Sequence, residues 1–362
     1  MAKAAKKKQS FTNTDIYLTL RLILDPRIAP RFSFRCADRN TMYVDFFIID
    51  GLFLKKTSYS RLMLADHFHL YVVHSNFKSE LIKEIRSVKI DFGNYILSNS
   101  KVENSIWAQD IWYDVKEIKF NSISEAANEL KKIHSHWASD SLTNHRRAKL
   151  IQEKLNFYKH PQLEFMGSLP KQKFGRWLMV DENTILASSN CRSPIPFGKI
   201  EFKENKEIPP SRAYLKLWEV LTLHEVLPNK NARCIDLGSC PGGWTWVLSQ
   251  VAGEVISVDK APLDPKIAKI RNVKFVKKDA FKLDPEEVGP IDWLFSDIIC
   301  EPNRLFELVQ VWKNSGVKNF VCTIKFKGKT DFEAIERFRS ITGSRLIHLY
   351  QNKHEITWIL QK

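Results

Sequence analysis

Residues 211–362 alternate between short apolar runs and amphipathic stretches, and this pattern constrains the fold more than any other feature of the sequence. The runs with the length and composition of β-strands are Arg233–Gly238, Glu254–Lys260, Val273–Ala280, Asp292–Ile299, Asn319–Phe326, Arg345–Asn352 and Glu355–Gln361. Helical periodicity fills three of the intervals, Trp244–Gly253, Pro302–Gly316 and Asp331–Gly343. Strands that alternate with helices predict an α/β fold built on a doubly wound, mostly parallel sheet.

The end of the chain departs from this parallel pattern. The last two strand runs are separated only by a tight turn near Asn352 and Lys353. A connection this short joins antiparallel strands, whereas parallel neighbours need a long crossover. We therefore expect the final strand to be antiparallel to its neighbour.

The rest of the chain divides by composition into three further segments. Residues 1–10 predict a flexible basic tail, residues 11–160 predict one or two α+β modules, and residues 161–210, rich in proline, lysine and glycine, predict a linker or packing segment. Residues 211–362 then form the C-terminal domain.

Within the N-terminal region the expected elements are few. Strand-like runs occur at Asp15–Ile23, Met42–Phe47 and Phe68–Val73. A serine-capped helix is expected at Ser124–His134.

The chain is strongly basic, with a formal net charge of +15 at pH 7 and a pI of about 9.4. A charge of this size favours a polyanionic partner. Nucleic acid is the leading candidate, because each phosphate neutralised by lysine or arginine releases a counterion. The region 11–160 is the candidate for binding RNA.

The six cysteines form no CxxC pair, and two of them lie in apolar strand runs. This pattern argues for a reducing compartment, which we interpret as the cytoplasm, and against a disulfide framework or a zinc site. The histidines His134, His136 and His145 lack the spacing of a known metal site, so no metal is expected. No apolar run is long enough to span a membrane, so no membrane partner is expected either.

The segment Asp236–Trp244 reads DLGSCPGGW and lies between a predicted strand and a predicted helix. Gly238, Gly242 and Gly243 allow the backbone to turn tightly and to approach a ligand closely. Ligands of doubly wound sheets bind at the carboxyl ends of strands, where this segment lies. Its spacing does not fit the GxGxxG pattern of dinucleotide-binding folds, and Asp236 suits a cofactor with a cationic amino-acid portion.

The string DLGSCPGGW resembles the first motif of the FtsJ-type ribose 2'-O-methyltransferases. The resemblance covers Arg192–Lys362 and is greatest to the RlmM branch, which methylates a cytidine ribose of large-subunit ribosomal RNA. The segments RSPIPFG, PPSRAYLKLWE, DLGSCPGGW and SDIICEP are similar to that branch in order and spacing. The resemblance implies a Rossmann-like methyltransferase sheet, S-adenosyl-L-methionine as the cofactor, and RNA, above all ribosomal RNA, as the partner.

The resemblance also implies the cofactor contacts. Those in the glycine segment are Asp236, Gly238, Ser239, Cys240, Pro241, Gly242, Gly243 and Trp244, of which the last five line the methionine portion. Asp259 ends the second strand run, where an acid can accept both hydroxyls of the cofactor ribose. Asp279 ends the third strand run and is implied to contact the adenine edge, and Asp297 borders the same site.

The family uses a Lys-Asp-Lys-Glu tetrad, and the matching residues are Lys216, Asp297, Lys325 and Glu355. Lys216 falls on a helix before the first strand, and the other three lie at strand ends along the ligand-bearing edge. Transfer of a methyl group to a ribose hydroxyl requires that the acceptor oxygen be aligned and its proton removed. Lys325 is the expected base, with the two carboxylates orienting the ammonium groups.

The sequence departs from the RlmM branch in three places. It reads SRAYLKL where that branch has SRSTLKL, so Ala213 lacks a hydroxyl near the cofactor. After Lys325 it reads FKGKTDFE in place of a P-x-K-K run. Residues 1–150 do not match the RNA-binding THUMP domain of the branch.

Other functions use the same sequence features. A cytosine C5 methyltransferase needs a Pro-Cys nucleophile, and Cys300 in SDIICEP has no preceding proline, so we interpret it as a structural thiol. Adenine N6 enzymes need an [DN]PP[FYW] segment, which SDII is not. The alternatives that stay open are an RNA-binding or ribosome-assembly factor on a methyltransferase fold, and methylation of a different RNA such as transfer RNA or a messenger RNA cap.

Overall fold

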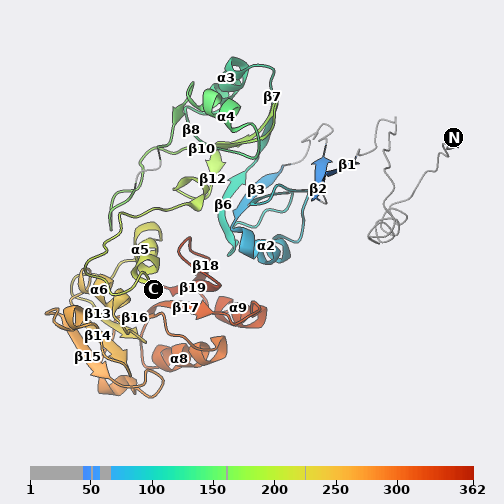
Figure 1. Ribbon diagram of the computed structural model, residues 1–362. Coiled ribbons are helices and arrows are strands. Elements are labelled where there is room, and N and C mark those ends of the chain that lie inside the picture. Colours follow the sequence, from blue (N-terminus) through green and yellow to red (C-terminus); the bar gives the residue numbers. More distant parts are fainter. Residues whose placement is uncertain (1–43, 50–51, 58–66, 160–161, 225) are drawn as a thin grey trace. The chain divides into compact units, whose positions relative to one another are not determined.

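The computed structural model describes residues 44–49, 52–57, 67–159, 162–224 and 226–362 (Figure 1). The chain divides into two compact units, Met1–Met63 and Leu64–Lys362. In the first unit, β1 (Val44–Ile49) and β2 (Leu52–Thr57) pair as an antiparallel two-stranded sheet. The strand expected at Met42–Phe47 overlaps β1, whereas the basic tail and the strand expected at Asp15–Ile23 lie outside the described residues.

The second unit contains a seven-stranded sheet in the order β15-β14-β13-β16-β17-β19-β18. Its strands are β13 (Arg233–Leu237), β14 (Glu254–Asp259), β15 (Val273–Lys277), β16 (Trp293–Ser296), β17 (Asn319–Lys325), β18 (Ser344–Ile347) and β19 (Glu355–Leu360). Neighbours from β15 to β17 are parallel, and β19 runs antiparallel to both β17 and β18. The predicted α/β class, with a doubly wound sheet and a final antiparallel strand, is confirmed.

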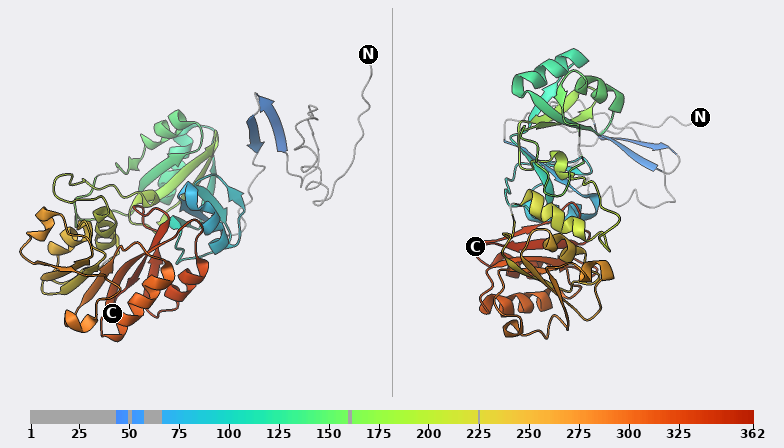
Figure 2. Two further views of the ribbon diagram at one scale, coloured as in Figure 1. Left: turned by 60° about the horizontal axis from the view of Figure 1, so that its bottom comes forward. Right: turned by 90° about the vertical axis from the view of Figure 1, so that its left-hand side faces the viewer.

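Helices cover both faces of this sheet (Figure 2). Its helices are α5 (Tyr214–Leu223), α6 (Gly243–Ser249), α7 (Pro265–Ala268), α8 (Pro302–Asn314) and α9 (Phe332–Arg339). Alternate strand residues point to opposite faces. In β13, Cys234 therefore packs with α5 and α6, whereas Ile235 packs with α8 and α9.

Two five-stranded sheets precede the seven-stranded one in sequence. The first has the order β12-β6-β3-β5-β4 and is antiparallel throughout. Its elements are β3 (His69–Val73), α2 (Lys78–Ile85), β4 (Ile90–Asp91), β5 (Tyr95–Ser98), β6 (Ala108–Tyr113) and β12 (Asn190–Cys191). β3 agrees with the strand predicted at Phe68–Val73.

The second five-stranded sheet has the order β7-β11-β10-β8-β9, with mixed pairing. Its elements are β7 (Lys116–Lys119), α3 (Ile123–Ile133), β8 (His136–Ser141), α4 (His145–Gln152), β9 (Asn156–Phe157), β10 (Gly175–Asp181) and β11 (Thr184–Ser188). Helix α3 begins one residue before the predicted Ser124, because Ser122 is its cap and accepts a hydrogen bond from the Glu125 amide.

Two boundaries differ from the sequence prediction. Strands β10 and β11 fall inside residues 161–210, so this part of the expected linker belongs to a sheet, where its apolar runs RWLMV and TILAS are buried. The strand run predicted at Arg345–Asn352 ends at Ile347, and residues 348–354 form the connection to β19. The amide of His348 donates to the Ile106 carbonyl at 2.9 Å, outside the sheet ladder, which explains why the strand stops there.

Candidate active site

The glycine segment forms the turn between β13 and α6 at the carboxyl end of the first strand of the sheet. Gly238 has a φ of 77°, in the left-handed region, and its amide donates to the Val258 carbonyl at 2.9 Å. A Cβ at this position would lie 2.7 Å from the Ile298 side chain. Glycine is therefore required here both by the backbone conformation and by the neighbouring loop.

Gly242 also has a left-handed φ, of 113°, and precedes the first residue of α6. A Cβ here would lie 3.0 Å from the Ile267 side chain of α7, and one on Gly243 would lie 2.8 Å from the Ser211 hydroxyl. Both glycines thus allow close packing of protein segments. Replacing Gly242 would disturb that packing and would not test cofactor binding cleanly.

Asp236 lies beneath this turn and is buried. Its Oδ2 accepts a hydrogen bond from the Thr245 hydroxyl of α6 at 2.7 Å, and Thr245 also contacts the Ser257 hydroxyl of β14 at 2.9 Å. Burial raises the pKa of the Asp236 carboxyl to about 7. Asp236 therefore stabilises the turn from below through Thr245, and its carboxyl does not lie on the accessible surface of the turn.

The residues between the first and second glycines differ in exposure. The Ser239 hydroxyl is buried and has no hydrogen-bond partner among the described residues. Cys240 is partly exposed, and its thiol donates to the Pro262 carbonyl at 3.3 Å; the bond between Cys240 and Pro241 is cis. Trp244 is buried, and its indole N–H donates to the Ala213 carbonyl at 3.0 Å, joining α6 to the residue before α5.

The two acids predicted at strand ends lie on neighbouring strands of the sheet. Asp259 ends β14, and its carboxylate accepts the amides of Cys240 and Ala261, each at 3.0 Å. It is therefore tied directly to the glycine turn. Asp279 follows β15, and the hydrogen bond from the Phe281 amide, at 3.0 Å, is the main cause of its lowered pKa.

The four predicted tetrad residues come together in one cluster beside this turn. Lys216 Nζ on α5 lies 2.6 Å from Asp297 Oδ1 and 3.1 Å from Glu355 Oε1. Lys325 Nζ lies 3.1 Å from the same Asp297 Oδ1 and donates to the Asp297 carbonyl at 2.6 Å. Asp297 thus bridges the two ammonium groups, and the cluster contains two positive and two negative side chains.

Sheet topology explains why residues so distant in sequence meet here. Asp297 follows β16, Lys325 ends β17, and Glu355 begins β19. Because β17 and β19 are antiparallel, the end of one and the start of the other share an edge, and Lys325 is paired with Glu355 in the register. Exposure differs within the cluster: the Lys216 side chain is 9% exposed, and that of Lys325 is 21% exposed. Lys325 is the more accessible ammonium group.

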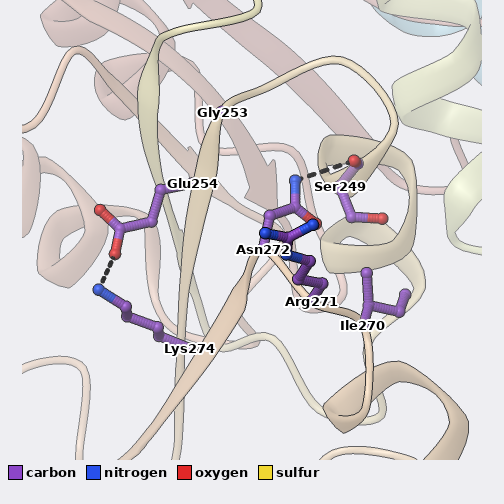
Figure 3. A pocket seen from close by; sticks show the side chains of 7 residues that line it. All are labelled: Ser249, Gly253, Glu254, Ile270, Arg271, Asn272 and Lys274. Atoms are coloured by element: carbon purple, nitrogen blue, oxygen red, sulfur yellow. Dashed lines mark hydrogen bonds and ion pairs between the residues drawn. The ribbon is translucent and has the colours of Figure 1, made fainter.

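The described pocket lies away from this cluster. It has a volume of about 550 Å³ and is lined by Ser249, Gly253, Glu254, Ile270, Arg271, Asn272 and Lys274 (Figure 3). Glu254 is the first residue of β14, and Asn272 precedes β15, so the pocket lies at the amino ends of these strands. Doubly wound sheets bind their ligands at the opposite edge.

Two residues of this region were not predicted from the sequence. Thr245 holds Asp236, and Glu219, on α5, is buried and accepts two backbone amides from residues 350 and 351. The sequence does mark Glu219 as unusual, because it and Lys216 are charged residues within the apolar helix YLKLWEVLTL. A buried charge requires partners, so such a residue is a candidate for a specific contact.

The alternative chemistries gain no support from the geometry. Burial raises the pKa of the Cys300 thiol to about 11, which disfavours the thiolate that a nucleophile needs.

Across the described ranges, no group of three or more histidine, cysteine or acidic side chains could hold a metal ion. The five cysteines within those ranges are free. No helix in the same ranges is long and apolar enough to cross a membrane.

Comparison with known proteins shows which family the C-terminal part of the chain is similar to. Residues 209–338 match the model of the FtsJ-like methyltransferase family, so the C-terminal part of the chain is an FtsJ-like methyltransferase domain. This agrees with the resemblance seen in the glycine segment.

Two relatives are similar to part of this chain. Both are named "Ribosomal RNA large subunit methyltransferase M". The protein from Azoarcus sp. (strain BH72) is 32% identical over 165 residues, which cover 41% of this chain and 45% of that protein. The protein from Xanthomonas oryzae pv. oryzae (strain PXO99A) is 33% identical over 187 residues, which cover 48% and 53%. The match thus spans about half the length of each relative.

Proposed function

We propose that this protein is an S-adenosylmethionine-dependent methyltransferase that acts on the 2'-hydroxyl of a ribose in RNA. The substrate we propose is large-subunit ribosomal RNA, because the relatives carry that RNA in their names. The proposal of a cytidine rests on the resemblance to the RlmM branch. The observation that carries the proposal is the cluster of Lys216, Asp297, Lys325 and Glu355 beside the glycine turn.

The residues around the turn fit the proposed cofactor. The left-handed Gly238 shapes the turn, and the Ser239 hydroxyl is a buried polar atom without a partner in the described ranges. Asp259 would hold the ribose hydroxyls, and Asp279 would lie toward the adenine. S-adenosylmethionine supplies a methyl group that is already activated by the positive charge of its sulfonium.

Lys325 is the proposed general base. Its Nζ is fixed by two contacts to Asp297, one to the carboxylate and one to the backbone carbonyl. A group held in this way needs little reorganisation to meet an acceptor hydroxyl, and orientation is a large part of the rate enhancement in such reactions. In its neutral amine form, Lys325 would take the proton of the 2'-hydroxyl while the new oxygen–methyl bond forms, the methyl–sulfur bond breaks and the sulfide of the cofactor leaves.

Lys216, Asp297 and Glu355 complete the proposed machinery. Lys216 contacts both carboxylates, so these oxygens are occupied and the cluster is held as one unit. A fixed ammonium group also stabilises negative charge that develops on the acceptor oxygen. Asp297, which contacts both lysines, would hold them in a fixed relative position.

The remaining part of the chain is proposed to bring the RNA to this site. The net charge of +15 suits a polyanion, and the region 11–160 is the candidate for contacting phosphates. We place the reaction in the cytoplasm, where free cysteines are maintained. No metal and no membrane takes part in the proposed reaction.

The test is methyl transfer from labelled S-adenosylmethionine to transcripts of large-subunit ribosomal RNA, followed by nucleoside analysis. The expected product is a 2'-O-methyl nucleoside, and a substrate with 2'-deoxyribose at the mapped position should accept no methyl group. Methylation of that deoxy substrate would show that the methyl group goes to the base and not to the ribose. Tight RNA binding without any transfer would favour the assembly-factor alternative.

A further inference from the structure

Helix α5 carries a second buried charge besides Lys216. Glu219 lies one helical turn further along the helix and is 3% exposed. Burying a carboxylate is costly unless its oxygens accept hydrogen bonds. Burial raises the pKa of Glu219 to about 7, which reflects that cost. Glu219 is not a member of the tetrad, so its burial needs another explanation.

Both oxygens of Glu219 accept backbone amides from a single connection. Oε1 accepts the Tyr350 amide at 2.8 Å, and Oε2 accepts the Gln351 amide at 3.0 Å. These amides belong to residues 348–354, which join β18 to β19 and which the sequence had predicted to be mostly strand. Charge-assisted hydrogen bonds of this kind are stronger than neutral ones.

The same connection leads directly into the tetrad. Glu355 follows it as the first residue of β19, and its Oε1 lies 3.1 Å from Lys216 Nζ. Helix α5 therefore holds the segment at two points, with Glu219 at residues 350 and 351 and with Lys216 at residue 355. The position of Glu355 depends on where this connection is anchored.

The connection is also held on its other side. The His348 amide donates to the Ile106 carbonyl at 2.9 Å, and the imidazole lies 4.5 Å from the Phe77 ring and 5.2 Å from the Trp107 ring, between centroids. The His348 Nε2 contacts the Lys353 carbonyl at 3.0 Å, within the connection itself. Residues 348–354 are thus fixed between α5 and the antiparallel sheet of residues 69–191.

We propose that Glu219 is a positioning residue for methyl transfer: it anchors residues 348–354 on α5 so that Glu355 meets Lys216. This proposal rests on the proposed function. Glu219 itself contacts neither substrate nor cofactor, and it acts through Glu355.

The test compares Glu219→Gln in two backgrounds of the full chain, wild type and Glu355→Gln. An amide side chain can accept only one of the two backbone hydrogen bonds. In the wild-type background, kcat for methylation of a large-subunit ribosomal RNA transcript should fall about 10- to 100-fold, as expected when a reacting group shifts by about 1 Å. KM for the RNA and the affinity for S-adenosylmethionine should change less than about twofold. In the Glu355→Gln background, Glu219→Gln should lower kcat further by less than about twofold, because the effects of substitutions at interacting residues are not additive.

The matched control is Asp110→Asn. Asp110 is also a buried carboxylate that accepts backbone amides, from Ser193 at 2.9 Å and Phe197 at 3.2 Å, but it lies in β6 and also pairs with Arg176 Nε at 3.3 Å. Its substitution should have the same effect in both backgrounds. An equal loss for Glu219→Gln in both backgrounds, or a loss confined to KM, would overturn the positioning role.

Hydrogen exchange separates this proposal from the proposed function. In the wild-type protein the amides of Tyr350 and Gln351 should be protected, and Glu219→Gln should release them. Free exchange in the wild type would overturn the anchoring even if the variant did not fold. A protected pair in a protein without methyl transfer would support the anchoring while the proposed function failed.

Discussion

The two halves of the candidate site are built in different ways. The half that we propose to bind the cofactor is local: the turn from Asp236 to Trp244 and the acid at Asp259 come from two neighbouring strands, and the Asp259 carboxylate contacts the backbone of the turn. The reacting half is assembled from single side chains on four elements, brought to one edge by the sheet topology. The first half should tolerate side-chain changes that leave the turn intact. The second should tolerate almost none.

The largest difference between the halves is expected for Lys325→Ala. The change removes the proposed base but leaves the glycine turn and Asp259 in place. Turnover should fall by about 100-fold or more, the usual contribution of a positioned base, while S-adenosylmethionine still binds. Single-turnover kinetics and calorimetry on the same preparation measure both quantities. Full activity in this variant would remove Lys325 from the chemistry.

Within the proposed cofactor half, the buried carboxyl of Asp236 should make the stability of the protein depend on pH. An unfolded aspartate releases its proton near pH 3.8, whereas folded Asp236 holds its proton up to about pH 7. Its contribution to the free energy of unfolding is therefore present at low pH and is lost as the pH rises from about 4 to about 7.

Asp236→Asn keeps the acceptor for Thr245 and lacks this titration. Relative to wild type, the variant should gain stability over that pH range, by an amount on the order of 4 kcal/mol if the full shift is realised. Urea denaturation at pH 4.5, 6 and 8 provides the measurement. Parallel stability curves for the two proteins would mean that Asp236 is ionised in the folded state.

Asp259→Ala should affect cofactor binding more than turnover. It removes a carboxylate that accepts the Cys240 and Ala261 amides and that we propose to hold the cofactor ribose. Loss of one charge-assisted hydrogen bond, worth about 1.5–3 kcal/mol, predicts a weakening of S-adenosylmethionine binding by about tenfold or more. At saturating cofactor, kcat should change little. Asp279→Ala, at the end of the next strand, serves as the comparison for a site further along the sheet edge.

The features that the sequence predicted depend on local contacts, and those that it did not predict depend on contacts between distant residues. The strand and helix alternation of residues 233–361 predicted the seven-stranded sheet, because each element is long enough to show its own periodicity. Glu219 and residues 348–354 could not be predicted in this way. Their structure depends on contacts to α5 and to Ile106, which lie more than a hundred residues away in sequence.

The same reason explains the missed strands β10 and β11. Their partners β8 and β7 lie far along the chain, and their apolar runs RWLMV and TILAS are short and flanked by polar, proline-rich sequence. Composition alone favoured a linker there. The tetrad was found from the sequence because a resemblance supplied the four positions together. No spacing rule links Lys216 to Glu355 across 139 residues.

The smallest effect is expected at Cys300, which lies close to the reacting half without belonging to it. It follows Asp297 by three residues, and burial raises the pKa of its thiol to about 11, so the thiolate is scarce at neutral pH. A cytosine C5 methyltransferase would depend on a thiolate that attacks the base, whereas transfer to a ribose hydroxyl forms no covalent bond to the enzyme. Cys300→Ser should therefore change turnover by less than about twofold, since it removes no reacting group. A loss comparable to that of Lys325→Ala, or a covalent adduct with 5-fluorocytidine RNA, would show that base chemistry operates at this edge. An unchanged rate together with an inactive Lys325→Ala would confine the chemistry to the lysine and carboxylate cluster.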